Sequence, residues 1–178
     1  MKISRIILLF SLAISMLGCS KDDGPDPIPP YTLSTANFPG TYAMNFLELK
    51  VEETITFSNG STSTSTSTKV GSVFQDVKYV FNTNNTFTAD GLYNSVETIR
   101  HPDGTTEVKP IVIVALDKTG SFTLKPTQGT LILIDQDNIT NVYEIKKYTP
   151  TEMWLYSEDV ATNGNSTVVT TQDVRFSR

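Results

Sequence analysis

The chain has 178 residues, of which 38% are apolar and 19% are charged, and its formal net charge is −5. A chain of this length fits one domain of ordinary size. It contains one Cys and one His, so neither an intrachain disulfide nor a zinc site with several Cys and His ligands is available. An acidic chain without a basic cluster also argues against nucleic acid as a partner.

Residues 1–18 have the features of a secretory signal peptide. Lys2 and Arg5 provide a positive start, and a mainly apolar run follows from residue 6 to residue 17. That run is too short to span a bilayer, which needs about 20 apolar residues, but it fits the apolar region of a signal peptide. It ends in Leu17-Gly18-Cys19, which resembles the bacterial lipobox. That resemblance implies cleavage before Cys19 and transfer of a diacylglycerol to its thiol.

Residues 19–36 are expected to form a flexible, Pro-rich tether. The residues that follow Cys19, Ser-Lys-Asp-Asp, resemble the surface-export signal of Bacteroidetes lipoproteins. Four prolines between residues 25 and 30 exclude a helix or a central strand and favour an extended spacer. The sequence therefore predicts a lipid-anchored outer-membrane protein displayed on the cell surface, with the periplasmic face as the alternative. The membrane is the expected partner, because several acyl chains anchor a protein stably; no protein partner is indicated.

After residue 37 no segment carries an apolar stripe at helical spacing, whereas strand-like alternation and turn sequences recur. Asn59-Gly60 predicts a two-residue hairpin turn with positive φ at both central residues. The Ser/Thr alternation over residues 61–68 is interpreted as an edge or protruding strand with both faces wet, with a flexible linker as the alternative. Further turns are predicted at residues 82–85, 101–104, 117–120, 135–138, 149–151 and 163–165.

These turns divide residues 37–178 into eight to ten short strands. Short connections pair neighbouring strands antiparallel, and a meander of eight or more twisted strands tends to close because closure removes exposed edges. We therefore predict an all-β fold, an antiparallel up-and-down meander of 8–10 strands closed into a β-barrel. Segments 111–116 and 131–134 are apolar on both faces, so their outer face is either covered or an interaction patch.

Three motifs in residues 38–178 resemble the lipocalin-like lipoproteins of Bacteroidetes. The first, Phe38-Pro39-Gly40-Thr41-Tyr42, is similar to the L-x-G-x-W opening of those domains. The other two contain Tyr79-x-Phe81 with Gly91-x-Tyr93, and Tyr143-Glu-Ile145 followed by residues 148–155. The resemblance implies a small barrel with one open mouth but no particular ligand.

The resemblance also implies which residues close one end of the barrel. In the family the Trp of the opening motif lies under a C-terminal Arg. Here Tyr42 takes the place of that Trp, with Arg175 or Arg178 as its partner, and of the two we name Arg175.

Large side chains expected inside the barrel are candidates for the wall of a ligand site. Trp154 and Tyr156 lie on the strand face opposite to Met153 and Leu155, so only one of these pairs can point inward. The candidate wall consists of Tyr42, Met44, Phe46, Tyr79, Phe81, Phe87, Tyr93, Trp154 and Tyr156.

The chain carries no motif for catalysis, phosphate binding or dinucleotide binding. His101 lies in a predicted exposed turn, and residues 135–138 fit a hairpin turn better than a Ca²⁺ loop. Glu48, Glu52 and Glu53 fit a solvated strand better than a pair of catalytic carboxylates. We therefore expect a protein that is not an enzyme, with no catalytic residue, metal or cofactor.

Two functions stay open. The first, which we prefer, is binding of a small hydrophobic or amphipathic molecule in the barrel. The second is a non-catalytic structural or protein-interaction role for a barrel filled by its own side chains. Interior volume distinguishes them, because a filled barrel leaves no room for a ligand.

Changing Cys19 to Ala should release the protein from the membrane fraction, because it removes the only thiol that can carry the predicted lipid. Cell fractionation followed by immunoblotting measures this directly. A Cys19→Ala protein that stays in the membrane fraction would contradict the lipobox interpretation.

Overall fold

A computed structural model describes residues 31–178, so the predicted signal peptide, Cys19 and most of the predicted tether lie outside the described residues. None of the helices in this part of the chain has the length and apolarity needed to cross a bilayer. A single short 3-10 helix in it, η1, covers Pro126–Gln128. The strands are β1 Gly40–Thr56, β2 Thr62–Phe81, β3 Thr86–Arg100, β4 Thr106–Val108, β5 Val112–Lys125, β6 Thr130–Asp135, β7 Thr140–Tyr148, β8 Glu152–Asn163 and β9 Ser166–Ser177.

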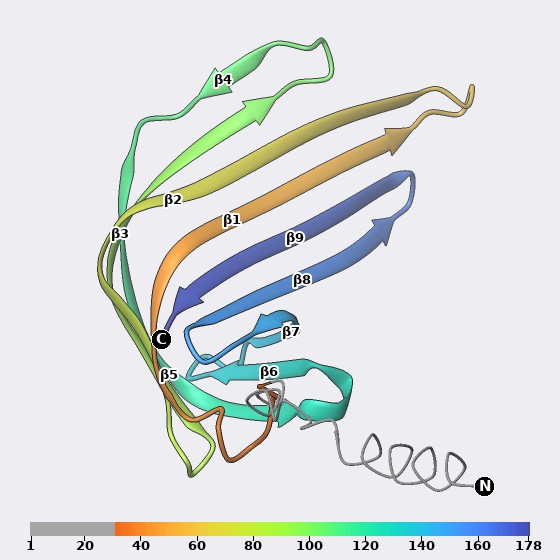
Figure 1. Cartoon of the computed structure of the whole chain (residues 1–178). Helices are drawn as coiled ribbons and strands as arrows, with labels where there is room; N and C mark the ends of the chain where they lie inside the picture. The colour runs from red at the N-terminus through yellow and green to blue at the C-terminus, as the bar shows by residue number, and fades with distance from the viewer. Residues whose placement is uncertain (1–30) are drawn as a thin grey trace, which may run out of the picture. The chain divides into compact units, whose positions relative to one another are not determined.

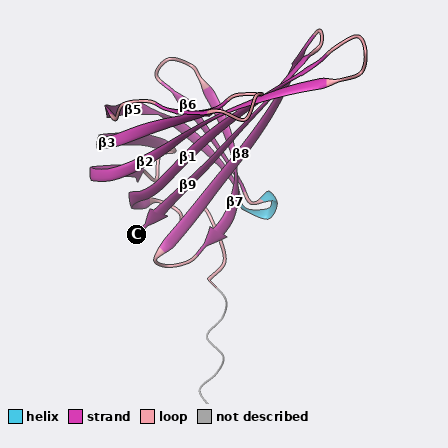
Figure 2. Ribbon diagram, turned by 90° about the horizontal axis from the view of Figure 1, so that it is seen from above, coloured by secondary structure: helices cyan, strands magenta, loops and turns pink. Residues whose placement is uncertain are grey.

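The strands form an antiparallel meander that closes on itself. The sheet order is β2-β1-β9-β8-β7-β6-β5-β3, and a further pairing between β2 and β3 completes an eight-stranded barrel. The last strand, β9, pairs with the first, β1, while the short β4 only extends the edge of β3. Figure 2 shows β3, β2, β1, β9 and β8 side by side. The predicted all-β meander barrel is confirmed.

The barrel wall is uneven in height. β7 pairs with β8 only as far as Glu144 opposite Tyr156, whereas β8 continues beside β9 to its end at Asn163. Figure 1 shows β1, β2, β8 and β9 running on past the shorter β6 and β7. At one end, called the open end below, these long strands therefore project beyond the rest of the barrel wall.

Four hairpin turns share one geometry. In the first, the Phe57 N–H donates to the Ser61 carbonyl and the Gly60 N–H donates to the Phe57 carbonyl. This is a three-residue loop whose last residue is left-handed. The predicted turn at Asn59-Gly60 is in the right place, but only Gly60 has a positive φ (81°), so the predicted turn type is wrong. The equivalent left-handed residues in the other three turns are Asn85, Gly104 and Asn138.

The predicted turn at residues 117–120 does not exist, because β5 runs unbroken from Val112 to Lys125. Gly120 is a close-approach glycine there: it pairs with Phe87 of β3 and Asp135 of β6, and a Cβ atom would collide with the Ile134 carbonyl oxygen. The Ser/Thr segment is a strand, as predicted. It is not an edge throughout, since Thr66 pairs with both Glu52 and Arg100.

The closed end of the barrel is filled by aromatic rings. Phe38 lies 4.8 Å from Phe81 and 5.5 Å from Phe122 between ring centroids, and Phe81 meets Phe122 edge-on at 5.2 Å. Tyr42 and Phe176 complete the cluster, and both are essentially inaccessible to solvent. Burial of rings this large is the main apolar contribution at this end.

Arg178, not Arg175, closes this end over Tyr42. Its guanidinium lies 5.2 Å from the centre of the Tyr42 ring, and its Nη atoms donate to the carbonyls of Asn37 and Pro39 at 2.7 Å each. It also reaches the hydroxyl oxygen of Tyr148 at 3.1 Å. The choice of Arg175 was wrong because that residue alternates with inward-facing Val174 and Phe176, so its side chain points outward.

Residues 31–36, predicted to belong to the tether, contact the barrel. Tyr31 stacks on Tyr148 with 5.3 Å between ring centroids, and Leu33 packs against the core. Ser34 and Asn37 exchange hydrogen bonds between side chain and backbone.

Arg178→Ala should lower the free energy of unfolding by about 1–2 kcal/mol, since several hydrogen bonds to a charged, partly solvated group are lost together. Urea denaturation measures this value. Arg100→Ala is the matched control, because the exposed Arg100 has no described side-chain partner among residues 31–178. Equal stability of the two variants would contradict the role given to Arg178.

Candidate ligand-binding site

The open end of the barrel holds a pocket of about 390 Å³, here called the mouth pocket. Its walls come from β1, β2, β3, β5 and β9 and from the segment that leads into β5. The apolar part consists of Leu47, Leu49, Tyr93, Pro110, Val112 and Val114, and the polar part of Lys69, Ser95, Glu97, Lys109 and Gln172.

A β-bulge determines which residues of β1 reach this pocket. Tyr42 and Met44 face the core, and the pairing with β9 then slips between Met44 and Phe46. The extra residue reverses the inside–outside alternation, so that Leu47 and Leu49 point into the barrel and Phe46 points out.

A second irregularity shapes β2. Val73 and Asp76 both have a positive φ (49° and 50°), and the register with β3 shifts on either side of Gln75. A positive φ is unusual for a β-branched residue. The resulting bulges let Phe74 stack on Tyr93 at 5.9 Å and pack beside the core.

A smaller cavity of about 190 Å³, here called the inner pocket, is lined by residues of β2, β3, β5, β6, β7 and β9. Gln172 lines both pockets, so the two adjoin at this residue. The Tyr143 hydroxyl donates to Gln172 Oε1 at 3.0 Å. The remaining lining residues are Tyr79, Phe87, Leu116, Lys118, Leu133, Asp135 and Asn141.

The lysines near the two pockets face carboxylates. Lys69 lies 3.9 Å from Glu97, which also accepts a hydrogen bond from Ser67, and Lys109 lies 2.7 Å from Glu107. The mouth pocket therefore has a polar rim in which positive and negative charges are balanced.

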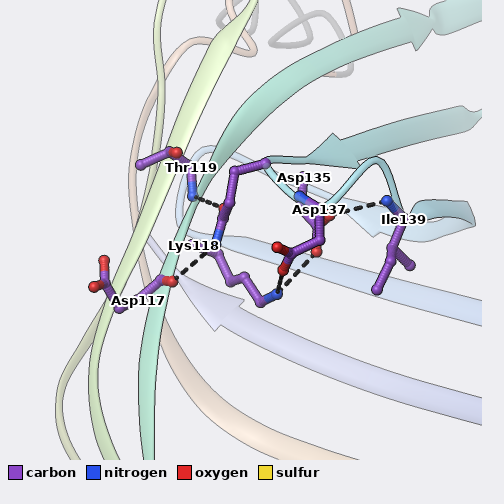
Figure 3. A network of polar contacts seen from close by, with 7 residues as sticks. Asp117, Lys118, Thr119, Asp135, Asp137 and Ile139 are labelled. Atoms are coloured by element: carbon purple, nitrogen blue, oxygen red, sulfur yellow. Dashed lines mark hydrogen bonds and ion pairs between the residues drawn. The ribbon is translucent and has the colours of Figure 1, made fainter.

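Lys118 is held by two carboxylates at the 135–138 turn (Figure 3). Its Nζ lies 3.0 Å from Asp135 Oδ2 and 2.9 Å from Asp137 Oδ2. The hydrogen bond from Lys118 lowers the pKa of the Asp135 carboxyl, and the backbone N–H of Ile139 adds to the effect. Residues 31–178 contain no group of His, Cys, Asp and Glu side chains able to hold a metal ion.

The predicted wall residues lie in three places: the core, the two pockets and the outer surface. Tyr42, Met44 and Phe81 are buried in the core, outside both pockets. Tyr93 lines the mouth pocket, and Tyr79 and Phe87 line the inner pocket.

Phe46, Trp154 and Tyr156 lie on the outer surface, so the prediction that they face the interior is wrong. Arg175 lies between the rings of Phe46 and Trp154, and Lys146 lies over Tyr156. Met153 and Leu155 take the inward positions and are buried. The predicted wall did not include Leu47, Leu49, Val114 and Gln172, which line the mouth pocket. The alternation of residues in β1 gives no sign of the bulge that turns Leu47 and Leu49 inward, and Gln172 lies in a polar segment.

The outer face at the start of β5 stays uncovered by residues 31–178. Ile111 and Ile113 are 64% and 70% exposed, and neighbouring Val108 is 64% exposed. Of the two alternatives for this apolar segment, covered face or exposed patch, the described part of the chain shows the exposed patch.

Comparison with known proteins finds no match: no family model matches the chain, and no curated protein matches it in sequence. The fold and the site therefore rest on the geometry described above.

The buried tyrosines predict a loss of stability at high pH. Burial raises the pKa of Tyr143 to about 12 and also raises the pKa of Tyr79. An unfolded tyrosine ionises near pH 10, so above that pH the unfolded chain releases protons that the folded chain retains, and stability falls. Tyr143 alone should contribute a loss of on the order of 3 kcal/mol between pH 10 and pH 12.

Urea denaturation at a series of pH values, with tyrosinate absorbance recorded in parallel, measures this loss. Tyr143→Phe should flatten the profile, whereas Tyr156→Phe, on the outer surface, should leave it much closer to that of the unchanged protein. Stability independent of pH over this interval would contradict the raised pKa values of Tyr143 and Tyr79.

Proposed function

We propose that the protein is a non-catalytic binding protein whose barrel takes a small hydrophobic or amphipathic molecule in the mouth pocket. One observation carries the proposal: the barrel is filled at its closed end but hollow at its open end. The mouth pocket of about 390 Å³ falls in the size range of small-molecule sites. Its apolar walls with a few polar groups are also typical of such sites.

The position of the pocket supports access from solvent. Leu47, Leu49 and Val114 form an apolar wall inside the barrel, while Lys69 and Lys109 lie at its rim. Lys69 and Lys109 side chains are 49% and 41% exposed, so a ligand can bury its apolar body without displacing a buried charge.

We also propose that the barrel works at a membrane surface, as a lipoprotein anchored through Cys19 in the outer membrane. The support is the sequence alone: the apolar run of residues 6–17, the lipobox-like Leu17-Gly18-Cys19 and the Pro-rich segment that follows. A membrane-bound barrel of this kind meets apolar molecules that partition into lipid.

A protein-interaction role is the second candidate, and the exposed patch of Val108, Ile111 and Ile113 favours it. A group of exposed apolar side chains marks a contact surface more often than a single exposed apolar residue does. The two functions use different faces of β5 and are separable by mutation.

Val114→Trp should abolish binding of the neutral apolar dye N-phenyl-1-naphthylamine, because the indole fills the mouth pocket. Ile113→Trp is the matched control: it is the adjacent residue on the opposite face of β5 and is largely exposed. We expect the dye to bind the unchanged chain and Ile113→Trp at one site with enhanced fluorescence, and to fail with Val114→Trp.

A dye titration that is the same for all three proteins, or that Ile113→Trp abolishes instead, would contradict a ligand site inside the barrel. Native mass spectrometry of the chain from residue 31 onward, which contains the whole described core, then tests for a molecule that co-purifies and is lost on unfolding.

A further inference from the structure

Two tyrosine hydroxyls inside the barrel have no protein partner. Tyr79 lines the inner pocket and Tyr93 lines the mouth pocket. Neither hydroxyl makes a hydrogen bond with any residue of the described part of the chain. They are not sealed, because residues 31–178 contain no fully buried side-chain oxygen or nitrogen that lacks a partner. Both hydroxyls are therefore accessible, and their side chains line the two pockets.

Gln172 adds a third donor at the junction of the pockets. Its Oε1 accepts the hydrogen bond from the Tyr143 hydroxyl at 3.0 Å, which leaves the Nε2 hydrogens without a partner among the described residues. Burial, together with nearby Tyr143 and Tyr93, raises the pKa of Tyr79. Donors from β2, β3 and β9 thus line the two adjoining pockets.

The same region has no unopposed positive charge. Lys118 is bound by Asp135 and Asp137, and the two lysines of the mouth pocket face Glu97 and Glu107. A carboxylate brought into this apolar interior would lose its hydration without gaining a free cation, which is costly. A neutral oxygen acceptor loses less hydration and can still take the unpaired hydrogen bonds.

We propose that the barrel selects neutral molecules with an apolar body and a carbonyl oxygen, as in an aryl ketone or ester. The apolar body lies in the mouth pocket against Leu47, Leu49 and Val114, and the carbonyl oxygen accepts hydrogen bonds from Tyr79, Tyr93 or Gln172. This inference rests on the proposed function and names the ligand class of the same site.

Competition against bound N-phenyl-1-naphthylamine tests the inference with three naphthalenes that differ in the substituent at position 2. We expect methyl 2-naphthoate to compete about fivefold more strongly than 2-methylnaphthalene, which has no acceptor. The anion 2-naphthoate should compete more weakly than its methyl ester. All measurements use residues 31–178, which form a compact unit of their own, in buffer without detergent, because the dye also fluoresces in detergent micelles.

Tyr79→Phe and Tyr93→Phe should each lower the preference for methyl 2-naphthoate over 2-methylnaphthalene about threefold to tenfold, with each competition corrected for the dye affinity measured for that variant. Gln172→Leu should have a similar effect, and Tyr156→Phe on the outer surface should have none. Thermal unfolding of each variant verifies that it is folded before binding is compared.

The outcomes separate the two proposals. If the dye binds but the ester competes no better than the hydrocarbon, and the Tyr→Phe variants change nothing, the carbonyl inference is overturned and the ligand site stands. Stronger competition by 2-naphthoate than by its ester overturns the selection of neutral ligands. If the dye fails to bind the unchanged chain, the proposed function fails, and this inference fails with it.

Discussion

The pairing of β9 with β1 is the constraint on which the rest of the structure depends. It joins the last strand to the first over most of their length, from Ala43 opposite Ser177 to Ile55 opposite Ser166. Without it the sheet would be an open, strongly twisted meander with two long edges, which is prone to pair with other chains. With it, the inner faces of the strands surround a common interior, and Arg178 is carried to the place where it covers Tyr42.

One end of the barrel interior is packed with side chains, and the other end contains a cavity. Rings such as Phe38, Phe81 and Phe122 fill the closed end at distances typical of aromatic packing. At the open end β6 and β7 are shorter than their neighbours. The mouth pocket at this end is lined by Leu, Val and Tyr side chains and by paired charges. A filled end can supply the burial that folding needs, which leaves the other end free to hold a cavity.

Bulges, rather than regular alternation, decide what lines that cavity. The slip in β1 turns Leu47 and Leu49 inward and Phe46 outward, where Arg175 covers the Phe46 ring. The bulges in β2 bring Phe74 against Tyr93. Each shift of one residue reverses the faces of a whole strand segment, so a small local feature controls the composition of the site.

The sequence by itself determined the fold class, because alternation and turn residues act locally: the strands, most turns and the antiparallel order follow from short-range preferences. It also indicated Tyr42, Phe81 and Phe87 as interior residues. Only the tertiary structure decided that Arg178 closes the barrel, that Gly120 lies within a strand, and that Gln172 rather than Trp154 faces the cavity. These outcomes depend on register between strands distant in the chain, which no local pattern specifies.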